Sequence, residues 1–379
     1  MRDNCNPERM KKIFSRIFLF IFILSLIVTV LLLISGRGRE TGPFVVMFFA
    51  FLALYVRTHP VLSVVTFSVW MSTFIAAPMF YPGVFLEWNG VQMKTFLMPI
   101  IMSVMFCMGT TLSIDDFKRV FIMPQAVLLG VFLQYTIMPF VGKGVAMVMA
   151  VNREVAAGIV LTGSSPGGVA SNVITFLAGG NVALSVTLTA FSTMLSPVMT
   201  PTFTKWLAGV YVPVSFWEMM VSILKMIILP IGGGLLSHWF LDRMGKVHPV
   251  YRKISDYIML GLPKYSMCAI CVACAIMTAN AREQLLIGPI VVSVVLSVIL
   301  HNFFGMVLGY WGARLAQLGE RDCRTISIEV GMQNSGMAAV LAMNVLKSEL
   351  ASIPGVVYSS WHNITGAIIA GYWMRHKAE

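Results

Sequence analysis

The stretch that decides the fold is Ile328-Glu329-Val330-Gly331-Met332-Gln333-Asn334-Ser335-Gly336, which places a carboxylate, an amide pair and two glycines inside an otherwise apolar segment. The chain has 16 acidic residues, and all the others fall in or near apparent loops or segment ends. An ionisable side chain at membrane depth costs about 3 kcal/mol or more on insertion scales, so Glu329 is a functional-site candidate. The neighbouring glycines allow the helix to unwind, which is tolerated at that depth only where protein or a water-filled cavity surrounds the backbone. A broken helix with one carboxylate is typical of the centre of a cation-coupled transporter.

A second interrupted stretch lies earlier in the chain, inside the apolar run from about residue 151 to 180. It reads Thr162-Gly163-Ser164-Ser165-Pro166-Gly167-Gly168-Val169-Ala170-Ser171-Asn172. Pro166 followed by two glycines must interrupt any helix there. Two interrupted segments in corresponding places of two halves predict an inverted-repeat transporter, with its site near the bilayer midplane where the breaks cross.

The composition of the 379-residue chain indicates an integral membrane protein. The chain is 58% hydrophobic and 11% charged, with a mean hydropathy of +0.83, whereas about 25% charged residues is usual for soluble domains. At roughly 20 apolar residues per helix, there is room for about ten to twelve spans and little soluble domain. The formal net charge of +11 is spread between apolar segments. It therefore follows membrane topology rather than nucleic-acid binding.

The sequence contains no cofactor motif, phosphate loop or nucleic-acid-binding stripe, so we expect no cofactor and no nucleic-acid partner. Cys268, Cys271 and Cys274 follow one another at i, i+3 and i+6 in an apolar segment. We interpret them as small packing residues on one helix face, because no histidine or metal-ligand loop accompanies them. No disulfide is required.

Twelve spans are expected along the chain. The first runs from Ile13 to Ser35 after several basic residues, but it is longer than the apolar region of a signal peptide and lacks the cleavage pattern, so we expect it to be retained. The others run over about residues 43–56, 61–81, 95–112, 121–149, 151–180, 182–207, 216–240, 254–277, 285–315, 325–346 and 353–374.

The distribution of Lys and Arg between alternating loops predicts the orientation. Seventeen of them, including Arg2 and Lys377, fall on the side that holds both termini, and eight fall on the other. The positive-inside rule then places both termini in the cytoplasm, in the inner (cytoplasmic) membrane of a cell. Lys225 and Lys264 lie inside spans, where each snorkels to an interface, pairs with a helix carbonyl or contacts substrate.

From about residue 61 to 376 the chain resembles the bile acid:sodium symporter family. The resemblance rests on four motifs together: Pro166-Gly167-Gly168-Val169-Ala170-Ser171-Asn172-Val173, Gly180-Asn181-Val182-Ala183-Leu184-Ser185-Val186-Thr187-Leu188-Thr189, Glu329-Val330-Gly331-Met332-Gln333-Asn334 and Trp361-His362-Asn363. It implies an all-α polytopic membrane protein with ten helices in two inverted five-helix repeats and two crossed broken helices. The two spans within residues 1–60 lie outside that unit, as a scaffold or a lateral interface.

The resemblance also implies two domains that move against each other. The panel domain is expected at about residues 61–81, 95–112, 216–240 and 254–277. The core domain carries the broken helices and is expected at about residues 121–149, 151–180, 182–207, 285–315, 325–346 and 353–374.

Carried over residue by residue, the family's motifs imply two sodium sites and a substrate site. The first sodium site comprises Ser171, Asn172, Ser185, Thr189 and Glu329. The second comprises Gln134, Glu329, Val330, Met332 and Gln333, with Val330 and Met332 acting through backbone carbonyls. The substrate site comprises Val169, Asn334, His362 and Asn363, and Val169 replaces a threonine that many family members carry.

The chemistry of these residues agrees with that implication. Na⁺ is a hard cation that prefers a cage of oxygens, which hydroxyls, amides, freed carbonyls and one shared carboxylate provide. One carboxylate between two cations leaves a net positive centre that favours an organic anion, as do the N-termini of the half-helices after Gly168 and Gln333. Simpler explanations are helix packing for Ser185 and Thr189, and a packed histidine bonded to a helix carbonyl for His362.

These observations predict a sodium-coupled secondary active symporter that imports an organic anion by alternating access, the anion being bile-acid-like, pantothenate-like or a keto acid. Its partners are then Na⁺, the anion and the lipid bilayer, and the oligomeric state is open. Three alternatives stay open: a proton-coupled carrier in which Glu329 titrates, a non-transporting sensor, and a membrane enzyme with Ser164 or Ser165 as nucleophile and His362 as base. The enzyme is disfavoured because Ser-Ser-Pro-Gly-Gly lacks the Gly-x-Ser-x-Gly spacing.

Overall fold

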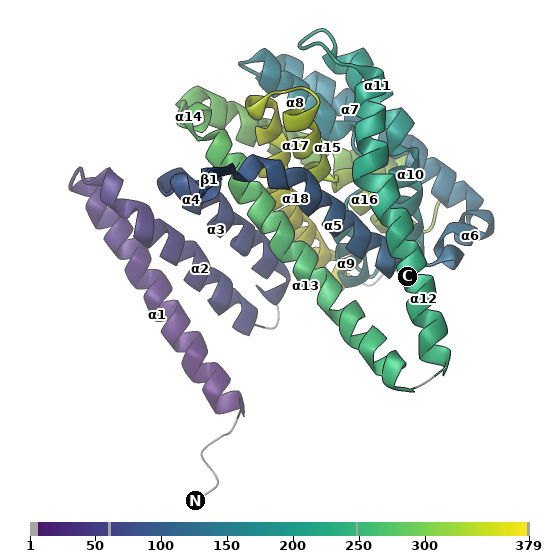
Figure 1. The fold of residues 1–379 in the computed structure, drawn as a ribbon, viewed down its shortest axis with the longest axis horizontal. Coiled ribbons are helices and arrows are strands. Elements are labelled where there is room, and N and C mark those ends of the chain that lie inside the picture. The colour runs from purple at the N-terminus through teal and green to yellow at the C-terminus, as the bar shows by residue number, and fades with distance from the viewer. Residues whose placement is uncertain (1–6, 60–61, 248, 377–379) are drawn as a thin grey trace, which may run out of the picture.

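The computed structural model describes residues 7–59, 62–247 and 249–376, and almost all of its regular structure is helical (Figure 1). Within those residues, seven helices are long and apolar enough to cross a membrane, and three shorter apolar helices accompany them. The prediction of an all-helical protein with many membrane-spanning segments is confirmed. The inverted repeats and the total of twelve spans stay predictions, and Arg2 and Lys377 lie outside the described residues.

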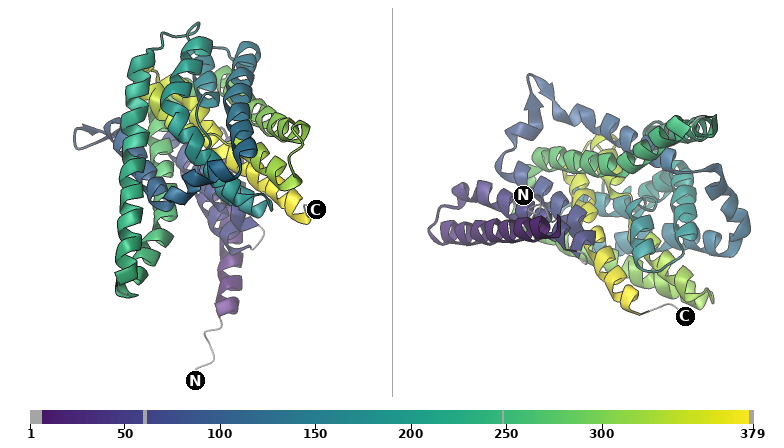
Figure 2. Two further views of the ribbon diagram at one scale, coloured as in Figure 1. Left: turned by 90° about the vertical axis from the view of Figure 1, so that its right-hand side faces the viewer. Right: turned by 90° about the horizontal axis from the view of Figure 1, so that it is seen from below.

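The first three long helices form a row at one edge of the molecule. They are α1 (Pro7–Ile34), α2 (Gly42–Thr58) and α3 (Thr66–Phe80), separated by the short turns η1 (Gly38–Thr41) and η2 (Leu62–Val65). Figures 1 and 2 show α1 on the outside of this row, with α2 between α1 and α3. Most side chains of α1 are exposed and apolar, which suits a helix that faces lipid.

A small hairpin precedes the next helix pair. The elements are α4 (Gly83–Leu86), β1 (Glu87–Trp88), β2 (Val91–Gln92), η3 (Met93–Phe96), α5 (Leu97–Thr111) and α6 (Ile114–Ile122). The hairpin lies between the expected spans 61–81 and 95–112. α6 begins with a capping box, in which the backbone N–H of Ser113 donates to the Asp116 carboxylate at 2.9 Å.

The first broken span follows in the middle of the chain. The elements here are α7 (Pro124–Met149), α8 (Arg153–Gly163), α9 (Ala170–Leu177) and α10 (Val182–Ala208). The helix stops before Pro166 and resumes after the glycines, as the sequence predicted. The side chains of Asn152 and Asn181 accept backbone hydrogen bonds and thereby cap α8 and α10.

The expected span 216–240 contains an interruption that was not predicted. It consists of α11 (Phe216–Ile223), the single π-helical turn η4 (Leu224–Ile228) and α12 (Leu229–Val247), and it is followed by α13 (Pro249–Asn280) and α14 (Arg282–Leu285). Lys225 lies in the π-helical turn and Lys264 lies in α13, and both side chains are exposed. The neighbours of Lys225 in the turn, Met226 and Ile227, are buried, so the lysine points away from the protein core.

The second broken span lies near the end of the chain. The elements are α15 (Gly288–Leu315), α16 (Glu320–Gly331), α17 (Ser335–Asn344) and α18 (Glu349–Arg375). The helix is interrupted over Met332, Gln333 and Asn334, which lie in the stretch that the sequence singled out.

Buried apolar side chains gather in two main clusters. One joins α3, α5, α11, α12 and α13 to α17, with a few residues of α8, α10 and α18. The other joins α7, α8, α10, α15, α16 and α18. Cys271 and Cys274 are buried in the first cluster, in keeping with a packing role. Cys268 is exposed, so the interpretation as a packing residue is wrong for this cysteine, because that part of α13 faces away from its neighbours.

The backbones of helices α5 and α12 are in direct contact at glycine positions. A Cβ atom added to Gly234 would collide with the carbonyl oxygen of Phe106, and it would lie 2.6 Å from the backbone nitrogen of Thr110. Two residues away on the same helix, a Cβ added to Gly232 would meet nothing within 4 Å.

This difference predicts that Gly234→Ala destabilises the protein and that Gly232→Ala does not. The first change must push α5 and α12 apart, at a cost of about 1–3 kcal/mol, whereas alanine in an open helical position gains about 0.5–1 kcal/mol. The apparent melting temperature of the purified protein, followed by fluorescence-detected size exclusion, measures both. Equal melting temperatures for the two variants would contradict the close helix contact.

Candidate functional site

The two breaks lie against each other. The backbone N–H of Gly168 donates to the carbonyl of Met332 at 2.8 Å, and the N–H of Asn334 donates to the carbonyl of Pro166 at 2.8 Å. A Cβ atom added to Gly168 would lie 2.7 Å from the carbonyl oxygen of Gln333. These contacts satisfy backbone groups that both helices leave free at their interruptions, so each break supplies partners for the other.

Glu329 lies directly beside this crossing. It belongs to the last turns of α16, and its side chain is 4% exposed. Its carboxylate accepts hydrogen bonds from the hydroxyls of Ser171 at 2.6 Å, of Thr189 at 2.9 Å and of Ser185. A Cβ atom added to Gly167 would lie 2.8 Å from Oε2 of Glu329. The carboxylate of the second break is therefore held by α9, α10 and the backbone of the first break.

The partners of this carboxylate are neutral. The ion pairs among the described residues join other side chains, and none of them includes Glu329. A buried carboxylate without a positive partner carries a desolvation cost of several kcal/mol, which three hydroxyl donors offset only in part. The arrangement therefore suits a group that brings positive charge to the carboxylate, either a cation or a proton.

Asn172 completes the first predicted sodium site. Its side-chain oxygen accepts a hydrogen bond from the hydroxyl of Ser185 at 2.8 Å. The structure thus brings together all five residues assigned to that site, from the consecutive helices α9 and α10 and from the distant α16. The packing explanation for Ser185 and Thr189 does not account for their hydroxyls pointing at one carboxylate.

Gln134, Gln333 and Val330 of the second predicted sodium site also meet, and all but one of the amide groups of the two glutamines are paired. The amide of Gln134 donates to Oε1 of Gln333 at 2.8 Å and to the carbonyl of Ser165 at 3.1 Å. The amide of Gln333 donates to the carbonyl of Val330 at 2.7 Å. Oε1 of Gln134 is buried and has no hydrogen-bond partner. A buried amide oxygen with free lone pairs is a ready ligand for a hard cation.

Two of the predicted substrate residues lie at the half-helix starts. Val169 immediately precedes α9 and is 37% exposed. Asn334 precedes α17, and its side-chain oxygen caps that helix by accepting from the N–H of Met337 at 3.3 Å. The backbone N–H groups of both half-helix termini are thus directed toward the crossing, although the side-chain oxygen of Asn334 already has a partner.

The other two predicted substrate residues, His362 and Asn363, are buried in α18. The amide of Asn363 donates to the carbonyl of Ser359 at 2.7 Å within the helix. The ring of His362 lies edge-on to Tyr358, with 5.4 Å between ring centroids, and its Nδ1 has no hydrogen-bond partner. Nδ1 of His362 therefore does not form the hydrogen bond to a helix carbonyl that the simpler explanation of this histidine requires.

Sequence reasoning missed the residues that fix the end of α16. The carbonyl of Gly331 accepts from the amide of Asn302 at 2.8 Å and from the hydroxyl of Tyr358 at 2.9 Å. The hydroxyl of Thr365 donates to the side-chain oxygen of Asn302 at 2.7 Å. The available signal was Asn302, an amide inside an apolar span that, like Gln134, has to find partners.

The serines proposed as nucleophiles in the enzyme alternative are engaged elsewhere. The hydroxyl of Ser164 donates to the carbonyl of Val160 at 2.8 Å, and that of Ser165 donates to the carbonyl of Leu161 at 2.9 Å. These are bonds to the preceding turn of α8, as serine commonly makes inside helices.

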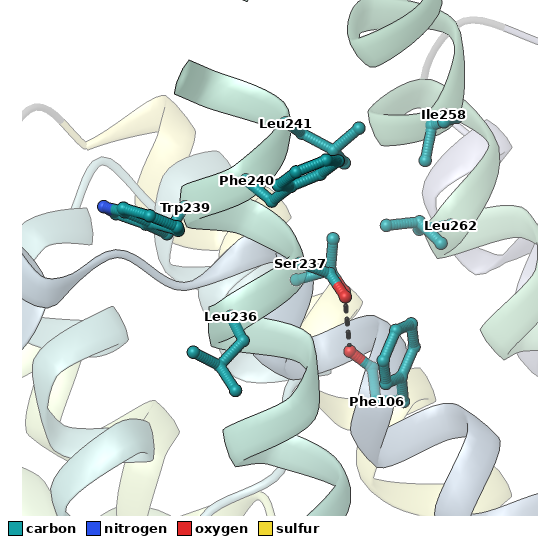
Figure 3. Close-up of a pocket in the computed structure, with 9 residues that line it drawn as sticks. Phe106, Leu236, Ser237, Trp239, Phe240, Leu241, Ile258 and Leu262 are labelled. Carbon is teal, nitrogen blue, oxygen red and sulfur yellow. Dashed lines mark hydrogen bonds between the residues drawn. The ribbon is translucent and has the colours of Figure 1, made fainter. Parts of the chain in front are cut away.

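Two surface cavities lie apart from the crossing. One has a volume of about 550 Å³ and is lined by mainly apolar side chains of α5, α12 and α13, as Figure 3 shows. The other, of about 680 Å³, is more polar and lies where the end of α9, the start of α10 and the start of α16 meet. Neither is lined by any of the residues predicted to bind sodium or substrate.

The crossing predicts that Gly168→Ala lowers the melting temperature more than Gly336→Ala does. The added methyl group of the first variant must displace the carbonyl of Gln333, whereas that of the second would meet only Ile101 at 3.8 Å, an ordinary contact. We expect a loss of about 1–3 kcal/mol for Gly168→Ala and less than about 0.5 kcal/mol for Gly336→Ala. Indistinguishable thermal unfolding curves would show that the breaks are not in contact.

Comparisons with known proteins identify relatives of this chain. The family model described as "Sodium Bile acid symporter family" matches residues 98–287. The chain is 39% identical over 311 residues to a Bacillus subtilis protein named as an uncharacterized sodium-dependent transporter, YocS, and the match covers 82% of this chain and 91% of that one. It is 34% identical over 311 residues to an Arabidopsis thaliana protein named as the probable sodium/metabolite cotransporter BASS1, chloroplastic, with coverage of 82% and 73%.

A rice protein with the same BASS1 name is 34% identical over 308 residues, and the match covers 81% of this chain and 72% of that one. The relatives therefore share most of the chain, and their names describe transport rather than catalysis. The chain belongs to the sodium bile acid symporter family, a family of transporters and not of enzymes.

Proposed function

We propose that this membrane protein is a sodium-coupled symporter that moves an organic anion by alternating access. The observation that carries the proposal is the Glu329 carboxylate, which lies at the crossing of two broken helices and is surrounded by hydroxyls instead of a basic side chain. The names of the relatives describe sodium-dependent transport, and this supports Na⁺ as the coupling ion.

The first sodium site is supported most fully. Ser171, Asn172, Ser185, Thr189 and Glu329 supply hydroxyl, amide and carboxylate oxygens within one hydrogen-bonded cluster. A hydroxyl that donates to a carboxylate can rotate and present a lone pair to a cation in the same place. Sodium would thus replace hydrogen bonds between the ligands with bonds from each ligand to the ion.

The second sodium site requires a rearrangement. Gln134 and Gln333 are bonded to each other, and Gln333 also donates to the carbonyl of Val330, so these acceptors are not free together. The carbonyl of Met332 is likewise bonded to Gly168. Binding of a second ion would release the Gln333 side chain and draw on the unpartnered oxygen of Gln134. This linkage would couple ion binding to the shape of the crossing.

The substrate proposal follows from charge. Two Na⁺ ions around one carboxylate leave a net positive charge at the crossing, and the positive dipole ends of two half-helices lie there. An amphipathic or small carboxylate, such as a bile-acid-like, pantothenate-like or keto acid, would suit that centre. Val169, Asn334, His362 and Asn363 are its proposed contacts.

The proposed motion divides the protein into two parts. The panel would contain α3, α5, α11 with α12, and α13, and the core would contain α7 to α10 and α15 to α18. The two main hydrophobic clusters follow this division only in part, because the cluster of the panel helices also contains residues of α17 and a few residues of α8, α10 and α18. α1 and α2 would stand outside both as a scaffold or a lateral interface. The charge bias of the loops supports cytoplasmic termini in an inner membrane.

A proton-coupled carrier is the second candidate, because a carboxylate held only by hydroxyls can also take a proton. Uptake into proteoliposomes separates the two. With taurocholate, pantothenate and pyruvate as test anions, an inward sodium gradient should drive accumulation of at least one of them, and choline in place of sodium should abolish it. Uptake that depends on a pH gradient and is unchanged when choline replaces sodium would contradict sodium coupling. In that case the carrier is proton-coupled, and Glu329→Gln should permit exchange but not net uptake.

Sodium should also stabilise the purified protein against heat without any substrate. At about 100 times its dissociation constant, a ligand that binds only the folded state adds about 2.7 kcal/mol to the free energy of unfolding. Glu329→Ala and Gln333→Ala should lose this sodium effect relative to an equal concentration of choline. The control is Asp242→Asn, which removes an exposed carboxylate paired with Lys246 and should keep the full effect. Sodium stabilisation that survives Glu329→Ala would contradict the shared carboxylate.

A further inference from the structure

A line of buried polar side chains leads from the Glu329 cluster to the polar surface cavity. On α16, Asp322, Thr325 and Glu329 are spaced i, i+3 and i+7, so they share one helix face. Asp322 is partly exposed, whereas Thr325 and Glu329 are both buried. At 1.5 Å per residue, Asp322 and Glu329 are about 10 Å apart along the helix.

The helices that face α16 continue this line. On α9, Thr175 follows Ser171 by one turn, so it lies on the face that reaches Glu329. On α10, Asn181 precedes Ser185 by four residues in the same way. Thr325, Thr175 and Asn181 therefore each lie one helical turn from a proposed sodium ligand, in the direction of the polar cavity.

Contacts between these residues close the gap between the helices. The hydroxyl of Thr325 accepts from the backbone N–H of Asn181 at 2.8 Å, and the amide of Asn181 donates to the Asp322 carboxylate at 2.9 Å. A Cβ atom added to Gly180 would lie 2.8 Å from both the methyl carbon of Thr175 and the hydroxyl of Thr325. The hydroxyl of Thr175 is buried and has no hydrogen-bond partner.

A buried threonine hydroxyl without a hydrogen-bond partner lowers the stability of the folded state by about 1–3 kcal/mol. A ligand bound beside Thr175 would remove this cost. The cavity of about 680 Å³ lies at the outer end of the same line and is lined by Asn181, Glu320, Arg321 and Asp322. Glu320 is paired with Arg324 at 2.8 Å. Asp322 is therefore the cavity carboxylate that contacts Asn181 and the line of polar residues. Arg324 also donates to the carbonyl of His376, so the cavity lies at the end of the molecule where α18 ends.

We propose that this seam, formed by Asp322, Asn181, Thr325 and Thr175, is the route by which Na⁺ passes between the Glu329 cluster and the solution at the α18 end of the protein. The inference rests on the proposed function, since it takes the ion at Glu329 to be sodium. Asp322 attracts the cation at the outer end of the seam, beside the cavity. The hydroxyls of Thr325 and Thr175 provide one intermediate binding position. Glu329 is then about four residues, or 6 Å along the helix, from Thr325.

Thiol accessibility tests the route without any transported anion. Thr325→Cys places a thiol in the seam, and Ile326→Cys places one at the next residue, which is equally buried but packs in the apolar cluster. The wild-type protein gives the background from its own cysteines. Intact-mass measurement follows the reaction with the cation 2-aminoethyl methanethiosulfonate and with the neutral methyl methanethiosulfonate in vesicles.

The cationic reagent should modify Thr325→Cys at least about tenfold faster than Ile326→Cys, because reactivity follows access. Na⁺ should slow the reaction of Thr325→Cys relative to choline at equal ionic strength. Adding Asp322→Asn should lower the rate with the cationic reagent by about fivefold and leave the neutral reagent within about twofold. The asparagine keeps an oxygen to accept from Asn181, so a purely structural clamp would change neither rate, and Asp322→Glu should restore the cationic rate.

Equal reactivity of the two cysteine variants would overturn the route, as would an effect of Asp322→Asn that is the same for both reagents. A failure of the proposed function looks different: heat stability of the wild-type protein would then be indifferent to sodium. If sodium stabilises the wild-type protein but does not slow the modification of Thr325→Cys, the sodium site stands and the route falls.

Discussion

A carboxylate buried in the middle of a membrane protein needs a positive partner, and the rest of this structure depends on how that need is met at Glu329. Among the described residues its partners are hydroxyl donors and it forms no ion pair, so in the proposed function a mobile cation offsets the electrostatic cost of the charge. A lysine or arginine in the same place would have neutralised the site permanently. Hydroxyls stabilise the charge enough for the protein to fold, and they can rotate to share the charge with an ion.

The two broken helices make this arrangement possible. An unbroken helix satisfies its own backbone and presents only side chains, whereas each break here frees N–H and carbonyl groups that the other break accepts. Glycine is required at the point of contact, because a side chain on Gly168 would meet the carbonyl of Gln333. The same crossing brings together Ser171 and Glu329, which are far apart in the sequence. Fold and site therefore rest on one set of contacts.

The sequence allowed the two breaks and the buried Glu329 to be predicted, because proline, glycine and a lone carboxylate are rare inside apolar spans and have few physical explanations. Ser171, Asn172, Ser185 and Thr189 were assigned to the first sodium site by resemblance. It did not reveal the π-helical turn that contains Lys225, since adding one residue to a helical turn leaves no signature in an apolar run. It also missed Asn302 and Tyr358, whose shared acceptor is a backbone carbonyl brought near them only by the fold. His362 and Asn363 were assigned by resemblance, and their burial in α18 depends on packing that no local pattern encodes.

The central claim is that Glu329 provides the charge that holds sodium. Equilibrium binding of ²²Na⁺ to the purified protein measures this directly, with Glu329→Gln compared to the wild type. The amide keeps the size of the side chain and one oxygen, and it removes only the charge. The account predicts that Glu329→Gln loses measurable sodium binding while it stays folded and monodisperse. Binding of ²²Na⁺ to Glu329→Gln with the wild-type affinity would contradict the account.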